Sequence, residues 1–235
     1  MVEGTTEETV KVGDSEYVVD IGKIPYFASF LRFQRMSRQC SESAVPEHDD
    51  LPFFATINHA VKHGYRHFFR GMSDNLADYQ VLCETLERLA VDVLGGAGLK
   101  DVFDEIRSYK AKWFDDDELG TNRRLRLCAR DAAFKLLYMF ILGEFEAEAE
   151  VRDSQSAFNA ALFVVSHPAT FRCRTRKMVR RAFEDRFSVS EKQRKVLDKW
   201  PVSEPEGNDE WREEEMTTES EESLCDSDDC WSIDS

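Results

Sequence analysis

The chain of 235 residues has no apolar run as long as a membrane-spanning helix. Its longest such run, residues 132–145, already contains Lys135 and Glu144 and falls well short of the roughly 20 residues that cross a bilayer. Residues 1–10 also lack the basic and apolar blocks of a secretory signal peptide. We therefore expect no membrane partner and a cytoplasmic location, a nuclear location, or both.

Cysteine patterns of metal, redox and disulfide proteins are also missing. The six cysteines show no C-x-x-C spacing and no regular framework, which in a reducing compartment argues against disulfides and against a zinc site. Cys83 and Cys128 lie among apolar residues and are interpreted as core thiols. No cysteine lies in a glycine-rich loop, and Gly95-Gly96 follows a predicted helix, the wrong context for holding a phosphate. The sequence therefore predicts no enzymatic activity, no cofactor and no metal.

Three histidines, His59, His63 and His67, are spaced four residues apart. Such spacing places imidazoles on one side of a helix, where two of them can face a metal. Gly64 is predicted to end the helix before His67, and no glutamate stands in the metalloprotease position after His59. We interpret all three as ordinary surface or partly buried histidines.

Basic residues are nearly absent from the end of the chain. Residues 203–235 contain 14 Asp or Glu and one basic residue, Arg212, a net charge of −13 out of −15 for the whole chain. Such a composition predicts a disordered acidic tail. The low isoelectric point therefore belongs to the tail and not to the folded body.

The body reads as a short β-hairpin followed by helices. Val10 to Val12 and Tyr17 to Val19 flank Gly13-Asp14, a dipeptide suited to a two-residue turn, and this turn would place Val10 opposite Tyr17 and Lys11 opposite Glu16. A helix is expected from Ile24, with Pro25 in its first turn. Residues 37–50 read as a loop, residues 65–72 as partly extended, and 110–120 as a connection between two parts. A short apolar piece at 51–54 leads into a predicted helix through Ile57, Ala60 and Val61, ended by Gly64. The other predicted helices are 75–93, with Asn75 as N-cap; 99–106; 122–146; 156–166; 174–187; and 190–200.

The order of elements over residues 9–107 resembles a BTB/POZ domain. The residues that carry the resemblance are VKVGDSEYVVDIGKIPYFASFLRF, DDLPFFATINHAVKHG and DYQVLCETLERLAVDVL. The chain looks like divergent fungal members of that family that carry a helical C-terminal extension. The expected fold class is thus α+β and mostly α: a small BTB-like hairpin or sheet capped by helices over 9–107, a helical extension over 121–200, and the acidic tail over 203–235.

The resemblance implies a non-catalytic protein-binding module, an adaptor or scaffold that self-associates or docks a protein partner. Some members of the family also tether substrates to a cullin-type ubiquitin ligase scaffold, so the resemblance implies such a link as a second role. Which partner is bound, and whether ubiquitin transfer is involved, stays open at this point.

A strongly basic segment near the end of the body offers an alternative function. Residues 171–199 carry a net charge of +7, and six of the basic residues fall within ten positions: Arg172, Arg174, Arg176, Lys177, Arg180 and Arg181. This patch predicts a nuclear regulatory protein that binds nucleic acid or acidic partners, with no recognised module for reading bases. A solvated helix face, or shielding of the patch by the acidic tail, are the other interpretations.

The tail also offers sites for acid-directed kinases. Thr218 and Ser223 are followed by acidic residues three positions later, and Ser227 is followed by Asp228-Asp229. Phosphorylation would add roughly −1.5 to −2 of charge at each site.

Overall fold

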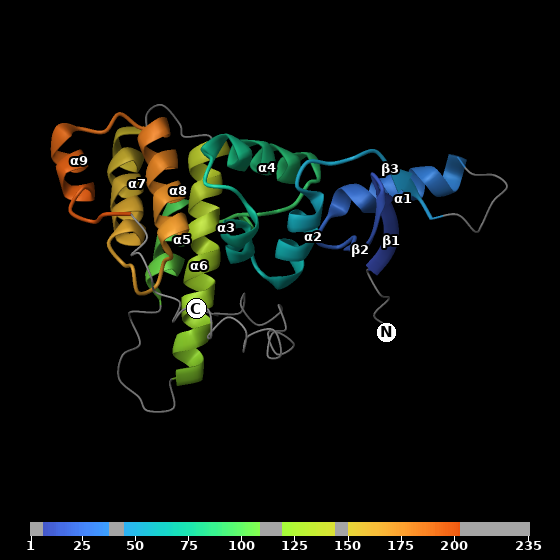
Figure 1. The fold of residues 1–235 in the computed structure, drawn as a ribbon, viewed down its shortest axis with the longest axis horizontal. Helices are drawn as coiled ribbons and strands as arrows, with labels where there is room; N and C mark the ends of the chain where they lie inside the picture. The colour runs from blue at the N-terminus through green and yellow to red at the C-terminus, as the bar shows by residue number, and fades with distance from the viewer. Residues whose placement is uncertain (1–6, 38–44, 109–118, 144–149, 203–235) are drawn as a thin grey trace. The chain divides into compact units, whose positions relative to one another are not determined.

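The computed structural model describes residues 7–37, 45–108, 119–143 and 150–202 (Figure 1). Within these ranges it is mostly helical with one small sheet, so the predicted fold class, α+β and mostly α, is confirmed. Residues 1–202 form one compact unit. The elements are β1 Glu7–Val12, β2 Ser15–Asp20, α1 Pro25–Ser37, β3 Glu47–His48, α2 Phe54–His63, the 3-10 helix η1 Tyr65–His67, α3 Phe68–Gly71, α4 Leu76–Arg88, α5 Leu99–Arg107, α6 Leu119–Leu142, α7 Glu150–Val165, α8 Cys173–Arg186 and α9 Glu191–Leu197.

Several predictions concern residues outside these ranges. The acidic tail, its kinase sites Thr218, Ser223 and Ser227, and most of the predicted connection 110–120 are among them. None of the helices in the described part is both long and apolar enough to cross a membrane.

The hairpin has the predicted register. Val10 lies opposite Tyr17 and Lys11 opposite Glu16, and Gly13 takes a positive φ of 57° in the two-residue turn. Val10, Val12 and Val19 are buried, because alternate residues of a strand point to the same face. Local turn geometry and a period of two were enough to fix this pairing.

The predicted loop over 37–50 contains a strand, which corrects that prediction. Glu47–His48 forms β3, parallel to β1, so that the sheet order is β2-β1-β3. The backbone N–H of Lys11 donates to the carbonyl of Pro46 at 2.9 Å, and the N–H of Gly13 donates to the carbonyl of His48 at 3.0 Å. A strand of two polar residues shows no alternation of apolar and polar side chains, so the sequence gives no strand signal there. The segment is extended because it pairs with the edge of β1.

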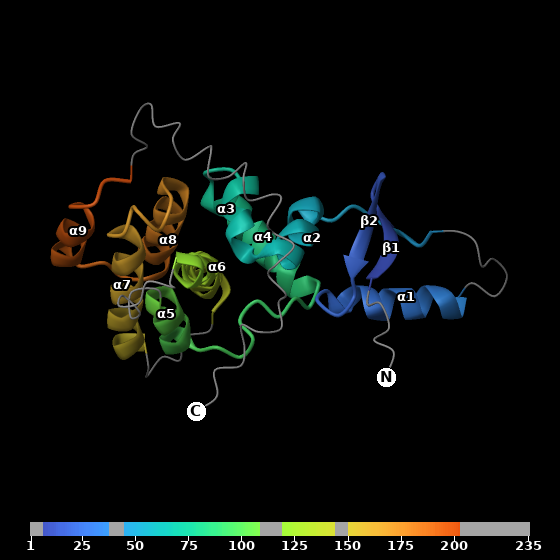
Figure 2. The same cartoon turned by 90° about the horizontal axis from the view of Figure 1, so that it is seen from below.

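Helix α1 begins at Pro25, one residue after the predicted start at Ile24, and lies against the sheet (Figure 2). Ile24, Phe27 and Leu31 are buried, while Phe30 is half-buried. Helix α2 ends at Gly64, whose φ of 109° is positive as predicted, although its ψ of 146° places it outside the left-handed helical region. Both helices thus end or begin where the sequence indicated.

The helix predicted over 75–93 was wrong in extent. The stripe expected to run to Val93 leaves the helical conformation after Arg88, because Ala90 takes a left-handed φ of 55° and the N–H of Val91 donates back to the carbonyl of Leu86. This bond is one of the pair that forms a Schellman end, a role for which glycine is the usual signal. An alanine there gives no such signal, and the first glycines that indicate a helix stop are Gly95-Gly96.

Residues 65–71 are helical, and only Met72, which ends α3, has an extended conformation. They form η1 and α3, and Phe68, Phe69 and Met72 are buried. Their aromatic content favours strands in isolation. The helical form instead places two adjacent phenylalanines on one hydrophobic core, so tertiary packing decided the conformation.

Helix α6 is the centre of the helical part. It packs against α5, α8, α4 and η1, and Figure 2 shows it end-on among its neighbours. Its side chains 132–134, 136 and 137 are buried, and the ring of Phe134 lies 4.4 Å from that of Phe68. The parts predicted as 9–107 and 121–200 therefore share one continuous apolar core.

Two ion pairs fix α6 within that core. Lys135, with a side chain only 7% exposed, contacts both carboxylate oxygens of Glu105 on α5 at 2.9 and 3.2 Å. One turn earlier, Asp131 accepts from the backbone N–H and the guanidinium of Arg66. Burial raises the pKa of Asp131 to about 6, in spite of the lowering effect of Arg66. These contacts hold α6 at a fixed position relative to α5 and η1.

Candidate functional site

The predicted basic patch lies on α8, and the helix forms because its other side is apolar. Met178, Val179, Ala182 and Phe183 are buried at helical spacing. The first turns of α8 nevertheless contain several cations and no acid. Positive charge at the N-terminal end of a helix opposes the helix dipole. The fold must therefore supply acceptors from elsewhere.

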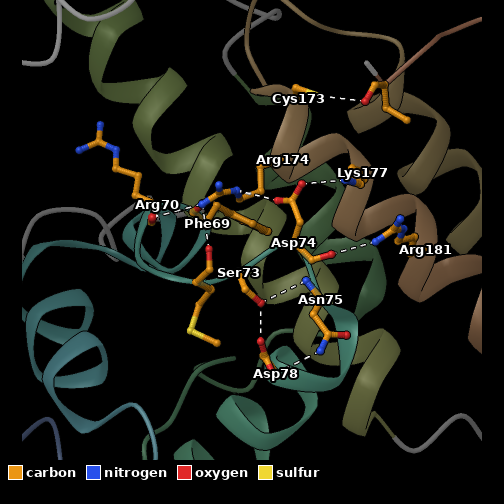
Figure 3. Close-up of polar contacts among 12 residues, drawn as sticks. Phe69, Arg70, Ser73, Asp74, Asn75, Asp78, Cys173, Arg174, Lys177 and Arg181 are labelled. Carbon is orange, nitrogen blue, oxygen red and sulfur yellow. Dashed lines mark hydrogen bonds and ion pairs between the residues drawn. The ribbon is translucent and has the colours of Figure 1, made fainter. Parts of the chain in front are cut away.

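Asp74, in the loop before α4, is the main acceptor (Figure 3). Its carboxylate contacts Arg174 Nε at 2.8 Å and Lys177 Nζ at 2.7 Å, and its carbonyl accepts from Arg181 Nη1 at 2.9 Å. We call these four residues the Asp74 clamp. The hydrogen bond and charge of Lys177 keep the pKa of Asp74 below its usual range, although desolvation opposes them. The clamp attaches α8 to the segment between α3 and α4.

Arg174 also caps the end of α3. Its Nη1 donates to the carbonyl of Met72 at 2.8 Å and to those of Phe69 and Arg70 at 3.3 Å each (Figure 3). The last carbonyls of a helix have no intrahelical partner, so a guanidinium is well suited to them. Residues about one hundred positions apart in the sequence are joined in this way.

The remaining predicted cations are also engaged within the fold. Arg176 is buried, and its Nη1 contacts the carbonyls of Val165 and Pro201 at 3.4 and 3.3 Å. Arg180 pairs with Glu184 and Asp198. Arg172 is half-buried next to the first residue of α8. The sequence predicted a basic surface patch. In the structure, most of the N–H donors of these side chains instead bond to acidic side chains and backbone carbonyls of the same fold.

We expect Asp74→Asn to lower the free energy of unfolding by about 0.5–1.5 kcal/mol, a small value because the Asp74 side chain is 45% exposed and screened by solvent. The effect should shrink with added salt. Thermal unfolding followed by circular dichroism measures it, and Asp185→Asn, the same change at an exposed position of α8, is the control. Equal effects of the two variants would contradict a stabilising role for the clamp.

The three histidines lie together, although Gly64 ends α2 before the third. The ring of His59 lies 4.6 Å from that of His63 and 4.8 Å from that of His67. Burial, and then the nearby charge of Arg66, lower the pKa of His67 to about 3. Within the described residues, no group of three His, Cys, Asp or Glu side chains is arranged to hold a metal ion. The packing of His67 is thus that of a neutral, buried imidazole.

The cysteines of the described part are thiols. Cys83 is fully buried, and burial strongly raises its pKa, which keeps it protonated and unreactive. Cys128 was predicted to be a core thiol, but it is only half-buried. Cys173 is half-buried as well, and its thiol donates to the carbonyl of Val202 at 2.9 Å.

An exposed apolar surface on α1 was missed at the level of the sequence. Phe33 is 67% exposed and Met36 is 72% exposed, and side chains three positions apart are neighbours on a helix. Both lie outside the stripe that packs on the sheet. This departure from the stripe was the available signal, since large apolar residues on the solvent side of a helix are unusual.

A shallow groove of about 320 Å³ lies along α1, with Met36 in its lining. Its lining is apolar at the base, and a salt bridge of 2.7 Å joins Arg35 of α1 to Glu8 of β1 at its border. The lining residues are Glu8, Ile21, Ala28, Leu31, Arg32, Arg35 and Met36. We call the groove together with Phe33 the α1 surface.

No family model matches this chain, and no curated protein or solved structure was found to be similar to it.

Proposed function

We propose that the protein is a non-catalytic adaptor or scaffold that self-associates through the α1 surface. The observation that carries the proposal is the exposure of Phe33 and Met36 on α1, where Met36 also lines an apolar groove. Burying large apolar side chains of this kind is a main source of affinity in protein interfaces. A solvated helix would not be expected to place them together.

A second copy of the same chain is the proposed occupant. The α1 surface offers projecting side chains and a groove next to each other, with charges of both signs from Glu8, Arg32 and Arg35. In a twofold symmetric dimer the same patch contacts itself, so each projecting residue meets the groove of the other copy. The surface is suited to such pairing because it contains both halves of the contact.

A BTB/POZ-like identity for residues 9–107 is part of the proposal. It is supported by the order of elements, namely a hairpin, an apolar helix, a short extended piece, a helix ended by Gly64, the short elements η1 and α3, and then α4 and α5. Attachment of a cullin-type ubiquitin ligase scaffold is the finer proposal. Purification of the full chain from cells, followed by mass spectrometry, tests it through the presence or absence of a cullin.

The nucleic-acid alternative receives less support from the described residues. Most cations of α8 contact Asp74, Glu184, Asp198 or backbone carbonyls, and so offer no continuous positive strip to a phosphate backbone. We therefore place protein binding first.

Self-association is tested by light scattering and sedimentation over a range of protein concentrations. We expect association that survives added salt, because the contact is apolar, and a loss of affinity of about tenfold or more in the double variant F33S and M36S. Val81→Ser is the control, since Val81 is a 40% exposed apolar residue on α4. Association that is unchanged in the double variant, or that disappears with salt, would refute the α1 surface.

A further inference from the structure

The methionines in the described part of the chain differ widely in exposure. Met36, in the last turn of α1, is 72% exposed, whereas Met72 and Met178 are 3% and 0% exposed and Met139 packs against the core. A dissolved oxidant reacts with a thioether only where it can reach the sulfur. Among these four methionines, Met36 is therefore the one that such an oxidant reaches first.

Met36 contributes to both halves of the α1 surface. Its exposed side chain projects from the helix, as does that of Phe33 three positions earlier. Met36 also lines the groove, together with the apolar side chains of Ile21, Ala28 and Leu31. In a twofold dimer that uses this surface, each contact contains Met36 of both copies. A chemical change at this one residue therefore acts twice in the same contact.

We propose that Met36 is an oxidation site, and that its oxidation by hydrogen peroxide separates associated copies of the chain. This inference rests on the proposed function, because it takes the α1 surface as the contact between two copies. The thioether sulfur of Met36 attacks one oxygen of the peroxide, so that a sulfur–oxygen bond forms and the oxygen–oxygen bond breaks. The proton of the attacked oxygen passes to the leaving hydroxide, which becomes water. The sulfur loses two electrons and becomes a sulfoxide.

The sulfoxide changes the balance between free and associated copies. Its oxygen is a polar hydrogen-bond acceptor, which water satisfies when the side chain of Met36 is exposed on a free copy. In the contact between two copies this oxygen would be removed from water and would face the apolar lining of the groove. Oxidation therefore favours the free copies.

Association and oxidation compete for the same side chain. On a free copy the sulfur of Met36 is open to the oxidant, whereas on an associated copy the second chain covers it. Peroxide thus acts on the free copies, and the sulfoxide hinders their return to the dimer. The rate of Met36 oxidation should accordingly fall as the protein concentration rises through the midpoint of association.

The test compares the full natural chain with the variant Met36→Leu. Leucine has a similar volume and hydrophobicity but no sulfur, so M36L keeps the apolar contact. Both proteins are treated with hydrogen peroxide, then with catalase, and then with dithiothreitol, which returns disulfides and sulfenic acids to thiols and leaves the sulfoxide. Mass spectrometry of tryptic peptides measures oxidation at each methionine, and sedimentation measures association.

We expect Met36 to be oxidised about tenfold or more faster than Met72 and Met178. Oxidation should weaken the association of the natural chain about fivefold or more. M36L should associate within about twofold of the natural chain, both before and after peroxide. This variant retains Met1 and Met216, which lie outside the described residues, and so it accounts for their oxidation.

Two further measurements separate a local effect from damage to the fold. Methionine sulfoxide reductases for both sulfoxide epimers should restore association, because they return the thioether. The melting temperature of the oxidised chain should change by less than about 2 °C, since Met36 is largely exposed. A larger fall in the melting temperature would attribute the lost association to unfolding and would count against the proposal.

Two other outcomes would overturn the inference while the proposed function stands. One is association that is lost in the double variant F33S and M36S but persists when Met36 is oxidised. The other is oxidation of Met72 or Met178 before Met36. Failure of the proposed function gives a different result: the natural chain does not associate before any peroxide is added, or the double variant associates as well as the natural chain. Either of these results would also remove the basis of the switch.

Discussion

Replacing Phe134 by alanine is expected to lower the free energy of unfolding by about 3–5 kcal/mol. Phe134 is fully buried on α6, and its ring contacts those of Phe68 and Phe69 at centroid distances of 4.4 and 5.9 Å. Removal of the ring leaves a cavity between α6 and the α3 segment, so both sides lose contacts. Urea unfolding followed by circular dichroism and by tryptophan fluorescence measures the change.

The same variant tests whether residues 9–107 and 121–200 unfold together. Because they share one core, we expect a single transition that moves as a whole, with both probes coincident. Phe33→Ala, a substitution of the same type at a position 67% exposed, should change stability by less than about 0.5 kcal/mol at low protein concentration. Two transitions, of which only one shifts in F134A, would show that the two parts are independent domains.

Acid is expected to destabilise the protein through His67, by about 2 kcal/mol between neutral pH and pH 5. The pKa of His67 is about 3 in the folded chain and near the ordinary 6.5 when unfolded. The unfolded chain therefore takes up a proton that the folded chain refuses. The stabilisation is complete above pH 6.5 and is lost progressively as the pH falls toward 3.

The physical cause is burial together with neighbouring positive charge. His67 is 6% exposed and lies near Arg66, Arg70, His59 and His63. Other groups titrate in the same range, including Asp131, whose raised pKa acts in the opposite direction. The measurement must therefore compare variants and not rely on the total pH dependence.

Urea unfolding at neutral pH and at pH 5 gives that comparison. His67→Gln, which cannot take up the proton, is expected to lack most of the acid-dependent loss seen in the natural chain. His63→Gln removes an exposed imidazole from the same group and should retain it. Identical pH dependence of the natural chain and the His67 variant would exclude a depressed pKa at this residue.

Local rules predicted much of the fold. The hairpin register followed from the Gly13-Asp14 turn and from alternation, and α1 and α9 begin at or next to Pro25 and Ser190, where N-terminal signals are strong. Asn75 caps α4 by accepting from the N–H of Ala77, as its position indicated. In each case the interacting groups are only a few residues apart, so the sequence contains the whole cause.

Errors arose where distant residues decide the conformation. Residues 47–48 become a strand because β1 offers an edge. Residues 68–71 become helical because the rings of Phe68 and Phe69 pack on Phe134. The α4 end at Ala90 depends on a left-handed alanine, which carries no recognisable signal. Propensity is a weak influence in all three places, and tertiary contacts override it.

By itself, the sequence determined the mostly helical fold class, the hairpin pairing, most helix starts and the separation of acidic tail from nearly neutral body. Only the tertiary structure decided what the cations of α8 contact: Asp74 and the α3 carbonyls lie about one hundred residues away, and no periodicity links them. The exposure of Phe33 and Met36 was likewise hidden. Charge and hydrophobicity belong to residues, but whether a side chain meets solvent, an acid or another cation depends on where the rest of the chain packs.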